Sequence, residues 1–106
     1  MITVIAEIRI HSGAEHRKEV LASFQQILSQ VLAETGCYAY QALIDTPAQA
    51  SFQRVDHDSI MMFEQWESVA HLEAHLQTAH MLAHQARVKD HVVNVDIRIL
   101  HDTTAQ

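Results

Sequence analysis

Residues 2–10 read ITVIAEIRI, and this stretch decides how the rest of the chain is organised. Apolar residues occupy every second position from Ile2 to Ile10, whereas Thr3, Glu7 and Arg9 fall between them. A period of two is typical of a β-strand, because successive side chains point to opposite faces. The stretch therefore predicts a strand with one wholly apolar face and one mixed face.

A long amphipathic helix is predicted next. Ser12 precedes Glu15 by three positions, which is the spacing of a capping box at a helix start. Gly36 is the expected end of this helix, because glycine commonly follows the last helical residue. Between them the apolar residues recur at helical spacing: Val20, Phe24, Ile27, Leu28 and Val31.

The middle of the chain contains two further predicted strands. The first covers residues 37–45 and ends at the turn-forming sequence Asp45-Thr-Pro47. Residues 51–55 fit either an edge strand or a loop. The next strand covers residues 59–66. Its residues 60–63 are all apolar, at even and odd positions alike, which predicts that both faces of the strand are buried.

The last third of the chain predicts helical structure followed by a strand. Ser68 opens a helix that continues, with a further turn or two, to about residue 88, and residues 93–99 alternate as a strand. The apolar stripe of this helix is Val69, Leu72, Leu76 and Ala79. The order β-α-β-β-α-β predicts an α+β, ferredoxin-like split β-α-β domain over residues 1–100, with a polar tail at 101–106.

Right-handed crossovers place both helices on one face of the antiparallel sheet and leave the other face bare. That face must carry Ile5 together with either Met61 and Phe63 or Met62 and Trp66. An apolar sheet face of this size usually marks an interface. We therefore expect a homodimer in which two sheets pair as a dimeric α+β barrel.

Composition excludes several classes of protein. The 106 residues include 7 Lys and Arg against 13 Asp and Glu, a net charge of −6, which argues against nucleic acid as a partner. No apolar run is long enough to span a membrane, and no signal peptide is visible. The single cysteine, Cys37, requires no oxidising compartment, so a cytoplasmic protein is expected.

Four of the nine histidines lie close together in the sequence, as the pairs His71/His75 and His80/His84. Spacing of four can place two imidazoles on one metal, but these side chains point in different directions around the helix, so no metal site is predicted. His71 and His84 are expected to be solvated. His75 borders the apolar stripe, where it could be a general base or a core-edge histidine bonded to a backbone carbonyl.

Aromatic and sulfur-containing side chains suggest a pocket. Trp66 shares a strand parity with Glu64 and Met62, and Tyr40 lies on the preceding strand. Such residues could hold a flat organic molecule, or they could be ordinary packing.

Three segments carry a resemblance to a known family: ETGCYAY at 34–40, FEQWES at 63–68 and LEAHLQTAH at 72–80. With them, nearly the whole chain resembles the antibiotic biosynthesis monooxygenase family of small dimeric ferredoxin-like proteins. The resemblance implies an oxygenase without cofactor or metal that oxidises an electron-rich aromatic with dioxygen, here a quinol such as reduced menadione, to a quinone. Ala79 departs from the family pattern, which often has a proline before the second histidine.

The resemblance also implies site residues. Trp66, His75 and His80 match the family pattern and are the expected catalytic positions. We expect His75 to be the base, Trp66 to be the wall of the substrate slot or an N–H donor, and His80 or Glu64 to support them. The expected substrate-binding residues are Met62, Glu64, Tyr40 and Leu72.

Two alternatives stay open. The chain could be a non-catalytic module that binds a quinone for a partner quinone reductase, or a haem- or metal-binding relative. If the chain is itself a quinol monooxygenase, a quinone reductase could still be a functional partner, because it would regenerate the quinol.

Overall fold

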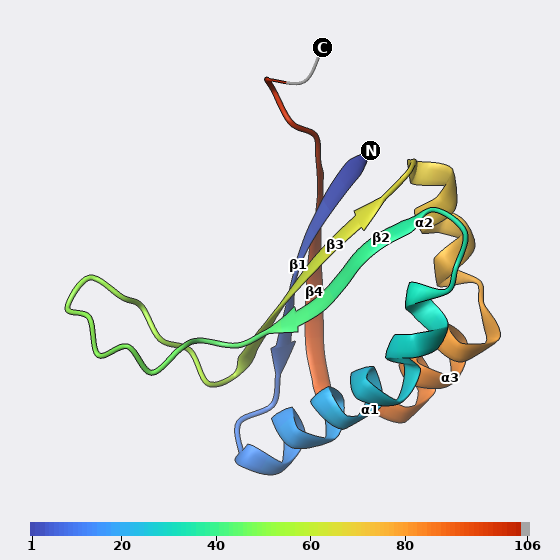
Figure 1. The fold of residues 1–106 in the computed structure, drawn as a ribbon. Coiled ribbons are helices and arrows are strands. Elements are labelled where there is room, and N and C mark those ends of the chain that lie inside the picture. Colours follow the sequence, from blue (N-terminus) through green and yellow to red (C-terminus); the bar gives the residue numbers. More distant parts are fainter. Residues whose placement is uncertain (105–106) are drawn as a thin grey trace.

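The computed structural model describes residues 1–104, so the end of the predicted tail, residues 105–106, lies outside the described residues. The elements are β1 (Ile2–Ile10), α1 (Ala14–Leu32), β2 (Cys37–Leu43), β3 (Ser59–Trp66), α2 (Val69–Leu76), α3 (Ala79–Val88) and β4 (Val92–Leu100). The strands form an antiparallel sheet of order β2-β3-β1-β4, and the helices lie on one face of it (Figure 1). The predicted α+β ferredoxin-like arrangement is confirmed.

The core lies between β1 and α1, as the sequence periodicity predicts. β1 is hydrogen-bonded to β3 on one side and to β4 on the other, which places it inside the sheet. Its even-numbered residues from Val4 to Ile10 are at most 6% exposed. They face the helical layer, whose buried apolar side chains from α1 include Val20, Phe24, Ile27 and Val31.

The second helical segment is two helices, where the sequence suggested one continuous run. Thr78 separates them, since its hydroxyl donates to the carbonyl of His75 at 2.8 Å and accepts from the backbone N–H of Met81 at 3.3 Å. One side chain therefore both satisfies the end of α2 and caps the start of α3. The break changes the direction of the chain, so that residues on α2 and α3 no longer share one helical periodicity.

Two local predictions about the helices are wrong. α1 begins after Gly13 without a side-chain cap, because the hydroxyl of Ser12 donates instead to Asp58 at 2.9 Å. Of the predicted stripe on α2, Val69 is 42% exposed and Ala79 is also exposed, so only Leu72 and Leu76 pack inward. Residues 51–55 belong to the long β2–β3 loop that projects from the sheet (Figure 1).

The β3 strand uses its two faces differently. Met62, Glu64 and Trp66 face the helices and are at most 7% exposed. Met61, on the opposite face, is 38% exposed within one chain, so burial of this face depends on the predicted homodimer and stays a prediction. The bare face therefore carries Met61 and Phe63 beside Ile5.

The edge strand β4 carries an apolar stripe that the helices leave uncovered. Ile97 pairs with Ala6 and therefore faces the helical side of the sheet, but it is 56% exposed. The full stripe is Val93, Val95, Ile97 and Ile99, all at least 46% exposed. Within residues 1–104, the helices are too short or too polar for any of them to be a membrane span.

Candidate active site

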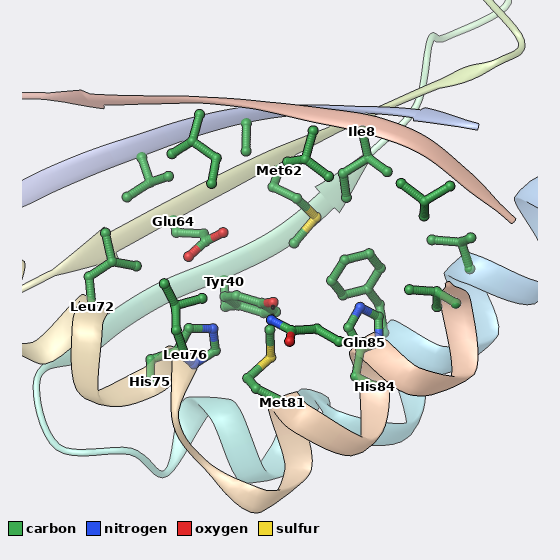
Figure 2. A pocket seen from close by; sticks show the side chains of 18 of the residues that line it. Ile8, Tyr40, Met62, Glu64, Leu72, His75, Leu76, Met81, His84 and Gln85 are labelled. Atoms are coloured by element: carbon green, nitrogen blue, oxygen red, sulfur yellow. Dashed lines mark hydrogen bonds between the residues drawn. The ribbon is translucent and has the colours of Figure 1, made fainter. Parts of the chain in front are cut away.

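A cavity of about 500 Å³ lies between the helical face of the sheet and α1, α2 and α3. Its walls are mainly apolar, and Val95 and Ile97 of the exposed stripe on β4 form part of them. A few polar residues line this apolar space. Figure 2 labels Tyr40, Glu64, His75, His84 and Gln85, and Lys89 also belongs to the lining. This volume is in the range of cavities that bind small organic molecules.

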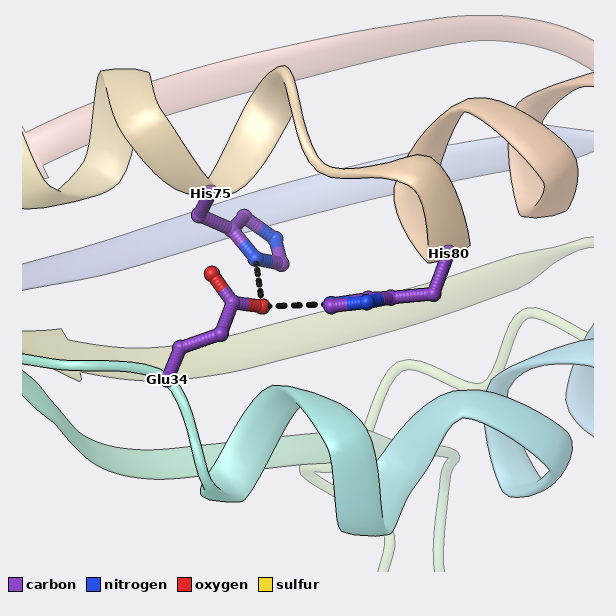
Figure 3. Close-up of side chains that lie close together, drawn as sticks. All are labelled: Glu34, His75 and His80. Atoms are coloured by element: carbon purple, nitrogen blue, oxygen red, sulfur yellow. Dashed lines mark hydrogen bonds and ion pairs between the residues drawn. The ribbon is translucent and has the colours of Figure 1, made fainter.

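Glu34 holds two histidines on one carboxylate oxygen. Its Oε2 lies 2.8 Å from Nδ1 of His75 and 2.7 Å from Nε2 of His80 (Figure 3). Glu34 follows α1, whereas the histidines lie on α2 and α3, so three segments meet here. The side chain of Glu34 is only 11% exposed and that of His75 only 1%, so bulk water screens this contact little.

The contact with Glu34 determines the tautomer of His75. A carboxylate oxygen can only accept, so Nδ1 of His75 must carry the donated proton. In the neutral ring, Nε2 then has a free lone pair, and within residues 1–104 the ring's hydrogen bond uses Nδ1 alone. Since His75 lines the cavity, this nitrogen is available to a bound molecule.

Burial keeps His75 neutral. It lowers the pKa of the imidazole below 6.5, and the hydrogen bond and negative charge of Glu34 oppose this effect only in part. An unprotonated imidazole at neutral pH can accept a proton from a bound ligand.

Trp66 contacts two residues of the site without lining the cavity itself. It is fully buried and donates its indole N–H to Oε1 of Glu64 at 2.9 Å. The centroid of its ring lies 4.6 Å from the centroid of the His75 ring. Burial raises the pKa of Glu64, which favours the protonated carboxylic acid, whereas the hydrogen bond from Trp66 has the opposite effect.

The other predicted pocket residues line the cavity. Met62, Leu72 and Tyr40 are each at most 7% exposed. The hydroxyl of Tyr40 lies 3.9 Å from the sulfur of Met81, and burial raises the pKa of Tyr40, so the phenol stays protonated. These residues can shape a slot but do not exchange protons near neutral pH.

The sequence analysis did not identify Glu34 as a site residue and did not predict the burial of His84. Glu34 lies in a segment that carries the family resemblance, but nothing local singles it out. His84 was expected to be solvated, and this is wrong: it is 4% exposed and its Nδ1 lies 2.8 Å from Oγ of Ser23. A serine at a buried position of an amphipathic helix is the one local signal for such a partner. His71 lies away from the cavity, bonded to Ser68 at 2.7 Å.

One group of side chains has the composition of a metal site. The ligand atoms of Glu34, His75 and His80 lie within 4.8 Å of one another. The expectation that the histidines point in different directions is wrong for His75 and His80, because the break at Thr78 turns them toward each other. One carboxylate and two imidazoles suit zinc or ferrous iron. The same atoms also satisfy one another by hydrogen bonds, so the cluster needs no ion to be stable.

The sequence and the fold place the chain in a family of monooxygenases. The family model described as "Antibiotic biosynthesis monooxygenase" matches residues 1–87, and the chain belongs to this family. It is 54% identical over 100 residues to the protein named "Probable quinol monooxygenase YgiN" of Escherichia coli K12, covering 94% of this chain and 96% of that protein. The protein of that name from Shigella flexneri matches equally.

Solved structures share the fold. The crystal structure of PA3566 from Pseudomonas aeruginosa has a TM-score of 0.79 at 28% identity, covering 97% of this chain and 94% of that one. Rv0793 from Mycobacterium tuberculosis has a TM-score of 0.77 at 21% identity, covering 98% and 96%. These structures show the shared fold, and the family match and the named relatives support a monooxygenase.

Proposed function

We propose that the chain is a cofactor-independent quinol monooxygenase that oxidises a menadiol-like quinol to a quinone with dioxygen. The observation that carries this proposal is the pair Glu34–His75. It presents an unprotonated imidazole nitrogen to an apolar cavity of about 500 Å³. The similarity to proteins named probable quinol monooxygenase supports the substrate class.

His75 is the proposed base. A bound quinol donates a phenolic O–H to Nε2 of His75, and transfer of that proton leaves an electron-rich phenolate. The imidazolium keeps its Nδ1–H on Glu34, whose negative charge stabilises the positive ring. Apolar walls exclude water from the anion, so that its electrons remain available to dioxygen.

The substrate itself supplies both electrons, which is why no redox cofactor is needed. Dioxygen accepts two electrons and the two phenolic protons as the quinol becomes the quinone. In the monooxygenase reaction, one oxygen atom then replaces a ring hydrogen and the other leaves as water, so quinol plus dioxygen gives hydroxyquinone plus water. Release of the peroxide before insertion gives quinone plus hydrogen peroxide, and a peroxide assay distinguishes the two products.

The remaining residues position these groups. His80 donates to the same oxygen of Glu34 and limits its movement. Trp66 fixes Glu64, and Glu64 in its protonated form can donate to the peroxide oxygen. In this proposal Trp66 acts through Glu64, because its indole N–H already has a partner.

Oxygen consumption with enzymatically reduced menadione tests the proposal, with a chelator present and no flavin added. Uptake should scale with protein. His75→Ala should lower kcat/KM by about 10²-fold or more, because general base catalysis contributes that much. His57→Ala is the matched control, since His57 is exposed on the β2–β3 loop.

Two results would contradict the proposal. Equal rates for wild type and His75→Ala would exclude His75 as the base. Binding of menadiol without oxygen uptake above the uncatalysed background would favour a binding module that serves a quinone reductase.

A further inference from the structure

We infer that His84 donates a hydrogen bond to the second oxygen of the substrate, so that the cavity selects aromatic rings with two para oxygens over simple phenols. This inference rests on the proposed function and assigns a specificity role to a residue outside the Glu34–His75 pair. It is carried by a second polar cluster, in which the buried side chains of Ser23 and His84 meet the exposed Arg87.

One pattern of hydrogen bonds leaves neither the hydroxyl of Ser23 nor Nδ1 of His84 without a partner. Nε of Arg87 lies 3.0 Å from Oγ of Ser23, and Oγ lies 2.8 Å from Nδ1 of His84. An arginine can only donate, so Oγ of Ser23 accepts from Arg87. Oγ could also accept from an Nδ1–H of His84, but the buried hydroxyl proton would then have no acceptor within residues 1–104. Donation from Ser23 to Nδ1 of His84 is therefore the pattern that pairs every group.

This pattern determines the tautomer of His84. Because Nδ1 accepts from Ser23, the proton of the neutral ring lies on Nε2. Among the residues that the structure describes, the hydrogen bond of His84 runs through Nδ1 and leaves Nε2 unused, and His84 lines the cavity. Burial lowers the pKa of His84 to about 4, so the ring remains neutral near pH 7. His84 therefore presents an N–H donor to the ligand.

The cavity has opposite polarity at its two imidazoles. His75 offers an acceptor and His84 a donor, and both lie on the helical side of the cavity, to the left and right of Tyr40 and Met81 in Figure 2. A series of ring contacts runs from one histidine to the other. The ring centroids are 5.4 Å apart for His75 and Tyr40, 6.2 Å for Tyr40 and Phe24, and 4.3 Å for Phe24 and His84. A flat ring on this wall meets a polar group at each end.

A para-diol matches this arrangement. One hydroxyl donates to His75, and the oxygen on the opposite edge of the ring accepts from His84. As the ring loses electrons, that second oxygen becomes a carbonyl oxygen, which is a good acceptor for the N–H of His84. A monohydroxy ring can satisfy His75 alone and leaves the donor of His84 unpaired, which costs binding energy.

The tautomers can be observed directly. Long-range ¹H–¹⁵N spectra of the imidazole rings, assigned with His75→Gln and His84→Gln, should show Nδ1 protonated in His75 and Nε2 protonated in His84 near pH 7. Protonation of His84 at Nδ1 would overturn the inference without touching the proposed role of His75.

Binding under anaerobic conditions tests selectivity without turnover. Calorimetric titrations would compare menadiol with 1-naphthol, which has one oxygen. His84→Leu should weaken menadiol binding by about tenfold or more, in line with the loss of one hydrogen bond in a desolvated site. It should not weaken 1-naphthol binding and should strengthen it to the extent that the unpaired N–H opposes it. His84→Gln should retain affinity, because its amide can place an N–H near the position of Nε2.

Two further variants complete the design. Ser23→Ala keeps the imidazole but removes the group that sets its tautomer, so it should weaken menadiol binding and spare 1-naphthol. His57→Leu, on the exposed loop, should change neither. Equal losses for both ligands in His84→Leu, or no loss, would overturn the inference alone. Failure of the wild type to bind menadiol would overturn the proposed function as well.

Discussion

His75 and Glu34, 41 positions apart in the chain, meet through a 2.8 Å contact between Nδ1 and Oε2 in a nearly dry part of the fold. The contact directs the other ring nitrogen into the cavity and leaves it unprotonated. A histidine on an apolar stripe is thereby converted from a core residue into a candidate base. Several outcomes depend on this relationship and on its neighbours.

Glu34→Gln should lower kcat for menadiol oxidation by about 10²-fold, because a neutral amide does not stabilise the imidazolium of His75. Glu34 raises the pKa of His75, so its loss should move the acid limb of the kcat/KM profile, expected below pH 6.5 in the wild type, to lower pH. The measurement is a pH–rate profile, with the exposed Glu67→Gln as control. An unchanged acid limb would mean that another group titrates.

Zinc should inhibit the reaction, and a chelator should restore it. A zinc ion bound to Glu34, His75 and His80 would replace the proton on Nδ1 of His75. The neutral ring would then carry its proton on Nε2, and this nitrogen could no longer accept a proton from the substrate. Rates measured against added zinc should fall in the wild type and be much less sensitive in His80→Ala. Stimulation by zinc would instead indicate a metal-dependent reaction.

Gly36→Ala should destabilise the turn that follows Glu34. Gly36 has φ of +83°, and a Cβ there would lie 2.5 Å from Cδ2 of His71. We expect the free energy of unfolding to fall by about 1–3 kcal/mol in urea titrations. Gly13→Ala is a matched control, since Gly13 also has a positive φ but its added Cβ would meet only an ordinary contact at 3.5 Å. An equal loss in both variants would mean that the contact with His71 is unimportant.

His84 should make the protein less stable in acid. Its folded pKa of about 4 lies below the unfolded value of 6.5, so the unfolded chain binds more protons between these values and stability falls as pH falls. The contribution lost between pH 7 and pH 4 is about 3 kcal/mol. Urea unfolding of wild type and His84→Gln at both pH values measures it. Parallel losses in the two proteins would show that His84 is not responsible.

The homodimer stays a prediction, and light scattering checks it by a mass of twice one chain. We expect the bare sheet face to be the interface, because Met61 and Phe63 lie there without a covering layer. Phe63→Glu should then give monomers. If Ile99→Glu on β4 dissociates the protein and Phe63→Glu does not, the interface follows the edge strand instead.

The strands, the helical face of the sheet and the family were accessible from sequence, because apolar periodicity and local motifs are properties of neighbouring residues. The alternation in residues 2–10 predicts a buried face that the structure contains. The same reasoning placed His75 at the border of the core, and the structure buries it completely.

Only the tertiary structure decided the chemistry of the site. Glu34 and His75, or Ser23 and His84, are far apart in sequence, and each histidine tautomer follows from which group its Nδ1 meets. Helical periodicity even indicated the wrong environment for His84, because the break at Thr78 reorients α3 relative to α2. Sequence periodicity determined which residues enter the core. The packing of three helices on one sheet determined which polar groups meet there, and hence which nitrogen accepts and which donates.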